Sequence, residues 1–348
     1  MNETKLFWMP DYFPSFSCKM GACRTACCTG WQVSISLENY FALIGTDCSM
    51  DLRRKMDCAL KPVDYPEEGK YAVIQPNYFG NCPLRLEDGR CGLQVELGED
   101  ILPDICRLYP RGVRRTERGY EISLAASCEA VPEMFLAQNE PIAFIEREWT
   151  MKLPPMPAEA LGDPAVRMEK IRTVQDRSRP LPDRLAALGG IAPEEANEAV
   201  LSPLWALLCS LGEHSDSIAP FVEKAAENVN NNEFCKVYAE AKADFETSFG
   251  GHETFFEHLM VNHMFFTRYP YSDGGRQEVQ RFASLVTVYA IVRMLSVLAT
   301  MTDHSAAMLC DTVAAAFRLI DHTDFDRTAL HLLSKDNLSG CLAQLLTV

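Results

Sequence analysis

Basic residues are scarce in this sequence of 348 residues, which has 33 Lys and Arg against 48 Asp and Glu and a net charge of −15 at pH 7. Residues 1–128 carry 15 basic and 17 acidic side chains, and the remainder carries 18 against 31. A nucleic-acid-binding protein needs a basic surface, so this class is excluded. The acidic C-terminal part either suits a basic, lysine-bearing partner or serves only to keep the protein soluble.

Nucleotide-binding fingerprints are also missing. The sequence has no P-loop, and its glycine pairs stand alone rather than following a strand as Gly-x-Gly. The first residues, MNETKLFWMPDYFPSF, lack the charged and then apolar organisation of a signal peptide. We therefore expect a cytoplasmic protein. In that reducing environment, clustered cysteines indicate metal or redox chemistry more often than disulfides.

A membrane span is not expected either. One apolar stretch, Phe282–Met301, is long enough to cross a bilayer. Arg293 lies near its middle, and a charge there costs about 3 kcal/mol or more in a bilayer. We predict that this stretch is a buried helix.

Cysteine, by contrast, is abundant, and ten of the 14 cysteines fall in the first 128 residues. Eight of these form two groups. The first group is Cys18, Cys23, Cys27 and Cys28, and the second is Cys82, Cys91, Cys106 and Cys128. Thiolates at such short spacings converge once a loop folds, and a soft metal is the usual reason. We predict that these eight cysteines contain the ligands of a metal centre.

The identity of the metal is open between iron and zinc. Zinc sites usually repeat a Cys-x2-Cys pair, which this sequence does not contain. Irregular spacing suits an iron–sulfur cluster, whose four ligands lie at the corners of a cuboid. A radical S-adenosylmethionine motif is absent, because Cys23 and Cys27 give its first spacing but Gly30 stands at its third position. A 4Fe-4S cluster is therefore favoured, with zinc as the alternative.

The N-terminal part is predicted to be loop-rich. Short helices are expected at Asn39–Gly45 and Asp51–Ala59, the first with a capping-box start. Small hairpins are expected around Glu87-Asp88-Gly89 and between Gly112–Thr116 and Glu121–Leu124, without a large sheet. Prolines crowd residues 152–183 and predict a linker around one helix, Ala165–Asp176.

The C-terminal part is predicted to be helical, because apolar residues recur there at three- and four-residue steps. The predicted helices are Arg184–Leu188, Pro193–Leu211, Ile218–Asn228, Asn232–Phe245, Glu253–Thr267, Gly275–Met301, Ser305–Asp321 and Phe325–Leu333. The expected fold is mainly α, with a cysteine-rich metal-binding domain at 1–150, a linker at 151–183 and a helical domain at 184–348.

The cysteine arrangement resembles the CxxxCxxCC-type zinc- or iron-chelating superfamily. The segments that carry this resemblance are Cys18 to Trp31, Asn81-Cys82-Pro83-Leu84, Gly89-Arg90-Cys91, Asp104 to Arg111 and Ser123 to Cys128. Within that superfamily, the chain is similar to the flagellin lysine-N-methylase (FliB) family. Phe256 to Phe266 and Tyr269-Pro270-Tyr271 are similar to the helical half of that family.

This resemblance implies an iron–sulfur protein that transfers a methyl group from S-adenosylmethionine to lysine ε-amino groups of flagellin. The donor would bind in a non-Rossmann pocket. The alternative is a non-catalytic protein that stores or delivers iron or zinc, or a zinc-stapled interaction domain, which would be colourless.

Candidate site residues beyond the cysteines come from this reaction. The catalytic residues are unknown from sequence, and the candidates are Asp104, Asn262 and Tyr269. A carboxylate or a tyrosine would accept the lysine proton, and Asn262 and Tyr269 would line the pocket. Arg107 and Arg111 either offset the charge of the thiolates, or hold a carboxylate, or form structural salt bridges. Trp31 is expected to shield the metal.

Overall fold

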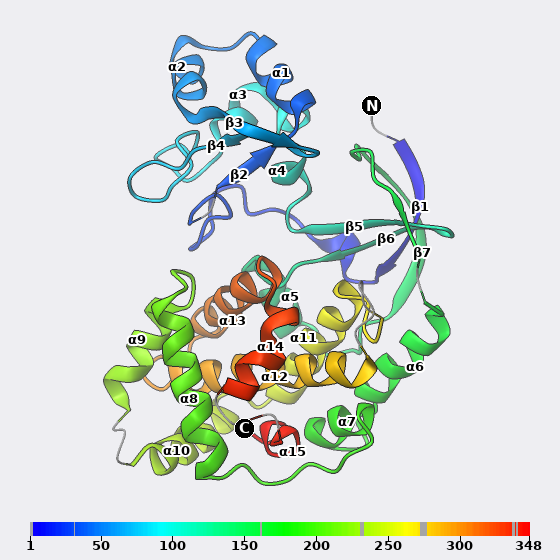
Figure 1. The fold of residues 1–348 in the computed structure, drawn as a ribbon, viewed down its shortest axis with the longest axis vertical. Helices are drawn as coiled ribbons and strands as arrows, with labels where there is room; N and C mark the ends of the chain where they lie inside the picture. Colours follow the sequence, from blue (N-terminus) through cyan, green and yellow to red (C-terminus); the bar gives the residue numbers. More distant parts are fainter. Residues whose placement is uncertain are drawn as a thin grey trace.

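The computed structural model describes residues 3–30, 32–160, 162–229, 233–271, 277–335, 338 and 340–348. It has three parts, a small lobe, a five-stranded sheet and a helical body (Figure 1). The small lobe lies at one end of the molecule, above the helices in that view, and the long strands of the sheet lie beside it. The segment of residues 18–28, which carries four cysteines, runs between the small lobe and the helices.

The small lobe contains a three-stranded sheet in the order β2-β4-β3. Its elements are β2 (Val33–Ile35), α1 (Leu37–Gly45), α2 (Met50–Ala59), β3 (Leu60–Glu67), β4 (Lys70–Ile74), α3 (Gly92–Leu97) and α4 (Asp104–Leu108). The Ser36 side chain caps α1 by accepting from the Asn39 N–H, and Ser49 caps α2 in the same way through Leu52. Both predicted short helices are confirmed.

The larger sheet has the strand order β7-β1-β6-β5-β8. Its strands are β1 (Glu3–Pro10), β5 (Arg111–Thr116), β6 (Gly119–Leu124), β7 (Phe144–Met151) and β8 (Ala158–Glu159). The predicted β5–β6 hairpin is confirmed. The expectation of no large sheet is wrong, because β1 pairs with β7 over its full length. These strands lie far apart in sequence, so no local pattern reveals the pairing.

The other predicted hairpin, around Glu87-Asp88-Gly89, is reduced to a turn. The Leu86 N–H and the Arg90 carbonyl oxygen close it at 2.8 Å, and an isolated bridge joins Arg85 to Cys91. Helix α5 (Ala130–Ala137) follows the β5–β6 hairpin.

The helical body confirms the predicted helices, with ends shifted by a few residues. Its helices are α6 (Pro164–Val174), α7 (Leu181–Leu188), α8 (Glu198–Glu213), α9 (Ala219–Asn228), α10 (Phe234–Ser248), α11 (His252–Phe266), α12 (Glu278–Ala299), α13 (Ala306–Asp321), α14 (Phe325–Lys335) and α15 (Leu342–Leu345). Mainly α therefore describes this region, whereas the N-terminal region also contains two sheets.

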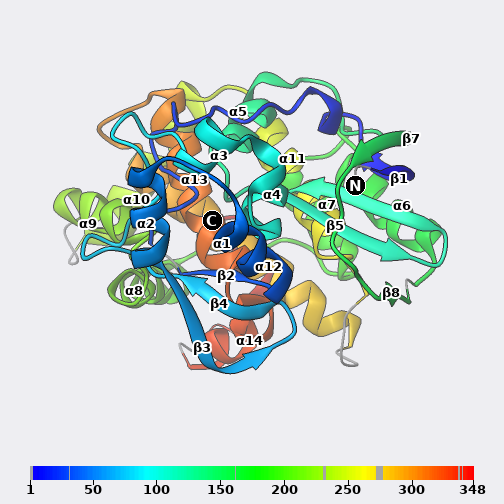
Figure 2. The ribbon, with the colours of Figure 1, turned by 90° about the horizontal axis from the view of Figure 1, so that it is seen from above.

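Helix α12 is the one helix in the described ranges with the length and apolar composition to cross a membrane, and it is buried within the protein. It lies among the other helices in both ribbon views (Figures 1 and 2). Arg293 on this helix forms a 2.7 Å ion pair with Glu246 and stacks 4.8 Å from the centre of the Phe245 ring. Its charge is thus paired inside the core.

Two hydrophobic cores organise the protein. The main core joins the five-stranded sheet to the helices and includes Phe7, Ile122, Leu259 and Val288. A second core, built from residues 33–102, fills the small lobe. The division of the chain at residues 150 and 183 stays a prediction.

Candidate metal centre

All eight cysteines of the two groups line a single cavity with a volume of about 370 Å³. Four come from the loop before β2, two from the segment between β4 and α3, one from α4 and one from the turn before α5. In that order they are Cys18, Cys23, Cys27, Cys28, Cys82, Cys91, Cys106 and Cys128. Segments that are 110 residues apart in sequence thus contribute thiols to one space.

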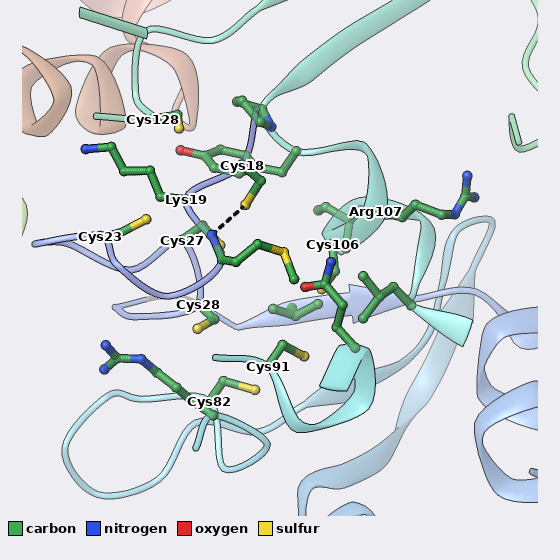
Figure 3. A pocket seen from close by; sticks show the side chains of 18 of the residues that line it. Cys18, Lys19, Cys23, Cys27, Cys28, Cys82, Cys91, Cys106, Arg107 and Cys128 are labelled. Atoms are coloured by element: carbon green, nitrogen blue, oxygen red, sulfur yellow. Dashed lines mark hydrogen bonds between the residues drawn. The ribbon is translucent and has the colours of Figure 1, made fainter. Parts of the chain in front are cut away.

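The thiols are distributed around the cavity. Figure 3 shows Cys128 and Cys18 towards one end and Cys82 and Cys91 towards the other. Within the described part of the chain, no three Cys, His, Asp or Glu side chains are grouped as ligands of one metal ion. The donor set therefore fits a thiophilic metal chemically, but its present arrangement is not that of a single-ion site.

The two cysteine-bearing loops are joined by backbone hydrogen bonds. The Cys82 N–H donates to the Cys28 carbonyl oxygen at 2.9 Å, and the Gly30 N–H donates to the Gly80 carbonyl oxygen at 2.9 Å. These two hydrogen bonds place Cys28 and Cys82, one cysteine from each group, on neighbouring stretches of backbone. The register of the loops thus brings Cys28 and Cys82 to the same wall.

Two glycines permit a close approach of the loops. Gly21 and Gly89 have φ angles of +98° and +87°, which residues with a side chain rarely adopt. A Cβ atom at Gly89 would lie 2.6 Å from the Gly21 carbonyl oxygen, and one at Gly21 would lie 2.7 Å from the Arg90 nitrogen. A side chain at either position would push the two cysteine groups apart.

The buried carboxylate of Glu129 holds the first cysteine loop against the body. Its side chain is 1% exposed and accepts the N–H groups of Arg24 at 3.2 Å and Thr25 at 3.0 Å. Lys19 donates to the same carboxylate at 2.8 Å. Burial alone would raise the pKa of Glu129, but these hydrogen bonds hold it below its usual value. No sequence pattern indicates this role, because glutamate beside cysteine has no distinguishing signature.

A second contact on the same loop comes from helix α13. Arg318 lines the cavity and donates to the carbonyl oxygens of Thr25 at 3.1 Å and Ser127 at 3.3 Å. With Arg85, it places positive charge near Cys28. The helical body therefore contributes directly to the wall of the cysteine cavity.

The thiols of the cavity differ in acidity. The Cys27 thiol donates a hydrogen bond to Cys28, which lowers the pKa of Cys28 to about 7 and raises that of Cys27. Burial raises the pKa values of Cys82 and Cys128 to about 11 and also raises that of Cys106. Because metal ligation needs thiolates, a cation entering the cavity would displace protons.

The predicted cofactor-binding residues fall in different places. Arg107 lines the cavity, but its guanidinium points away from the sulfur atoms in Figure 3 and bonds to the Asp104 carboxylate and the Lys152 carbonyl oxygen. Arg111 also lines the cavity, with its guanidinium 5.3 Å from the centre of the Phe16 ring. Trp31 lies outside the described residues.

The three candidate catalytic residues are not brought together. Asp104 is paired with Arg107 and lines a neighbouring cleft. The amide of Asn262 is buried, donates to the Leu124 carbonyl oxygen at 2.9 Å and accepts from the Tyr12 hydroxyl. Tyr269 is buried, and its hydroxyl has no hydrogen-bond partner among the described residues. Burial also raises the pKa of Tyr269.

Comparison with known proteins gives a family for the C-terminal part. Residues 198–348 match the FliB lysine N-methylase C-terminal domain. The predicted resemblance to FliB proteins is thus confirmed. No solved structure matches the chain.

Three curated relatives are similar to part of the chain. Lysine-N-methylases of Salmonella typhimurium and Salmonella choleraesuis are 28% and 27% identical over 141 residues, which is 40% of this chain and 34% of each relative. The flagellar biosynthetic protein FliU of Salmonella muenchen is 26% identical over 142 residues, which is 40% of this chain and 82% of FliU. The match to the two lysine-N-methylases thus spans about a third of their length.

Proposed function

We propose that this chain is an iron–sulfur-dependent protein lysine N-methyltransferase that uses S-adenosylmethionine and acts on flagellin. Methyl transfer to lysine is carried by one observation, the FliB lysine N-methylase domain at residues 198–348. Flagellin as the substrate is supported by the family resemblance and by the name of FliU as a flagellar biosynthetic protein. A cytoplasmic location, where thiols stay reduced, belongs to the same proposal.

The cysteine cavity supports the iron–sulfur part of this proposal. Its eight thiols are the residues that would hold the cluster, and four of them suffice for one. Zinc sites usually repeat a Cys-x2-Cys pair, whereas the irregular spacing of these cysteines along the chain suits a cluster. When bound, a cluster with an open iron would supply a Lewis acid for the donor's amino and carboxylate groups.

The reaction requires a neutral lysine nitrogen. The ammonium group loses a proton, and the nitrogen lone pair forms a bond to the methyl carbon. The bond from that carbon to sulfur breaks, its electron pair stays on sulfur, and the methylated nitrogen releases a second proton. A low-polarity cavity lowers the pKa of lysine and so favours the neutral amine. In this proposal the Arg111 guanidinium, at the cavity wall, orients a carboxylate of the donor.

A labelled-methyl assay tests this function. The anaerobically purified chain is incubated with flagellin and methyl-labelled S-adenosylmethionine, and the labelled residues are located by mass spectrometry of peptides. Label on lysine nitrogen is the expected result, with flagellin whose lysines have been acetylated as the control. A metal-loaded chain that transfers no label to lysine would overturn the proposal.

A further inference from the structure

A second cavity adjoins the cysteine cavity. This cleft has a volume of about 880 Å³ and lies between the small lobe and the sheet and helices. Ile105, Tyr109, Pro110 and Arg111 line both spaces. The turn from α4 into β5 is therefore a common wall, and a side chain in the cleft lies against the lining of the cysteine cavity.

The cleft has acidic groups on its small-lobe side. Glu38 at the start of α1 and Glu67 and Glu68 at the β3–β4 turn line it, and all three are exposed. Among the described residues, these three carboxylates form no ion pair, in contrast to Asp104, which is paired with Arg107. Arg111 is the one Lys or Arg in the described lining. The small-lobe side is thus suited to a cationic ligand.

Apolar groups also line the cleft. They include Tyr71 of β4, Phe266 at the end of α11, Pro154 and Pro155. A lysine side chain has this dual character, because its methylene stem packs on apolar surface while its ammonium group seeks carboxylates. An isolated metal ion would use the carboxylates without needing the apolar lining.

We propose that this cleft binds a lysine-bearing segment of the protein substrate and leads its side chain to the wall shared with the cysteine cavity. This inference rests on the proposed function, since it supplies the lysine that the reaction consumes. The carboxylates of the small lobe attract the positively charged segment to the cleft. The aromatic and proline side chains pack on the stem of the lysine whose nitrogen reaches the shared wall.

Peptide binding tests the inference without any methyl transfer. The probe is a fluorescein-labelled peptide of Gly, Ser and Lys, and its partner has every lysine acetylated. Anisotropy is measured with the full chain in the absence of S-adenosylmethionine. The variant carries Glu38→Gln, Glu67→Gln and Glu68→Gln, and the control carries the same charge change at the exposed Glu223, Glu227 and Glu240.

The lysine peptide should bind the unchanged chain and the control equally. The cleft variant should bind it about tenfold more weakly, because three partly exposed ion pairs with the peptide are lost. The difference in affinity between the variant and the unchanged chain should shrink at about 0.5 M salt. Equal binding of the acetylated peptide, or unchanged binding by the cleft variant, would overturn the inference. Unfolding temperatures within about 2 °C of one another would show that all three proteins are folded alike.

The same variants separate this inference from the proposed function. A chain that binds the lysine peptide through the cleft but methylates no lysine would contradict the function and leave the cleft assignment standing. A cleft variant that methylates flagellin with an unchanged KM would contradict the cleft assignment and leave the function standing.

Discussion

Glu129 shows how one residue can determine the shape of the candidate metal centre. It accepts hydrogen bonds from two backbone N–H groups of the first cysteine loop and from Lys19. Glu129→Gln keeps the size of the side chain but removes one acceptor oxygen and the charge. The expected result is a loss of about 1–3 kcal/mol in unfolding free energy and faster loss of metal to a chelator.

Glu133→Gln is the matched control for this prediction. Glu133 also pairs with the side chains of Lys19 and Arg24, at 2.7 Å each, but it is one-third exposed and, among the described residues, accepts from no backbone N–H group of the loop. Its replacement should cost less than about 1 kcal/mol and leave metal retention unchanged. Equal effects of the two variants, measured by urea unfolding and by chelator competition, would contradict the assigned role of Glu129.

The cysteines themselves give a second prediction at this scale. Replacing the first group by serine, at Cys18, Cys23, Cys27 and Cys28, should remove most of the bound metal, because a serine hydroxyl is a poor ligand for a soft metal. The control replaces Cys209 and Cys235, which lie on helices α8 and α10 away from the cavity. Metal per chain is measured after each purification, and equal contents would contradict the ligand assignment.

Among the elements, the contact between the two cysteine loops depends on glycine. Gly89→Ala forces a side chain onto a positive φ and into the Gly21 carbonyl oxygen. Gly69→Ala is a control with the same conformational cost, since Gly69 has φ +78° but no atom within 4 Å of its Cβ position. The unfolding free energy of the Gly69→Ala control should fall by about 1–2 kcal/mol, and this variant should retain its metal.

The Gly89 variant should lose more stability than the Gly69 variant and should also lose metal, because the clash separates the loops. Urea unfolding and metal analysis of the two purified variants check this. If both variants retained metal equally, the close approach of the loops would not be needed for the centre.

Local sequence patterns predicted some elements and missed others for physical reasons. Helix α12 was predicted because a continuous apolar run specifies a buried helix by itself. Strands β1 and β7 were missed because their partner choice depends on a pairing of residues from opposite ends of the N-terminal region. The two cysteine groups were predicted because closely spaced thiols are a chemical signal in the sequence. Glu129 and Arg318 were missed because they act through contacts with the backbone, which leave no signal in the sequence.

At the scale of the whole molecule, His258 couples folding to pH. This side chain is buried between the Phe135 and Glu140 carbonyl oxygens, and burial lowers its pKa. In the unfolded chain a histidine takes up a proton below about pH 6.5. The unfolded state then binds more protons than the folded state, so the unfolding free energy falls as pH falls below that value.

The loss attributable to His258 between pH 7.5 and 5.5 is expected to be on the order of 1 kcal/mol. Urea unfolding at both pH values measures it in the unchanged chain, in His258→Gln and in His214→Gln. The first variant should show a smaller pH dependence, and the variant at exposed His214 should behave like the unchanged chain. A pH dependence that is the same in all three proteins would contradict this account.

The molecule as a whole presents cysteines from four segments to one cavity, and its residues 198–348 match the FliB lysine N-methylase C-terminal domain. The central claim is that this cavity holds an iron–sulfur cluster. The most direct test is anaerobic purification followed by an absorption spectrum and analysis of iron, sulfide and zinc. The account predicts a brown protein with about four irons and as many sulfides per chain. A colourless protein with stoichiometric zinc and no iron would contradict it.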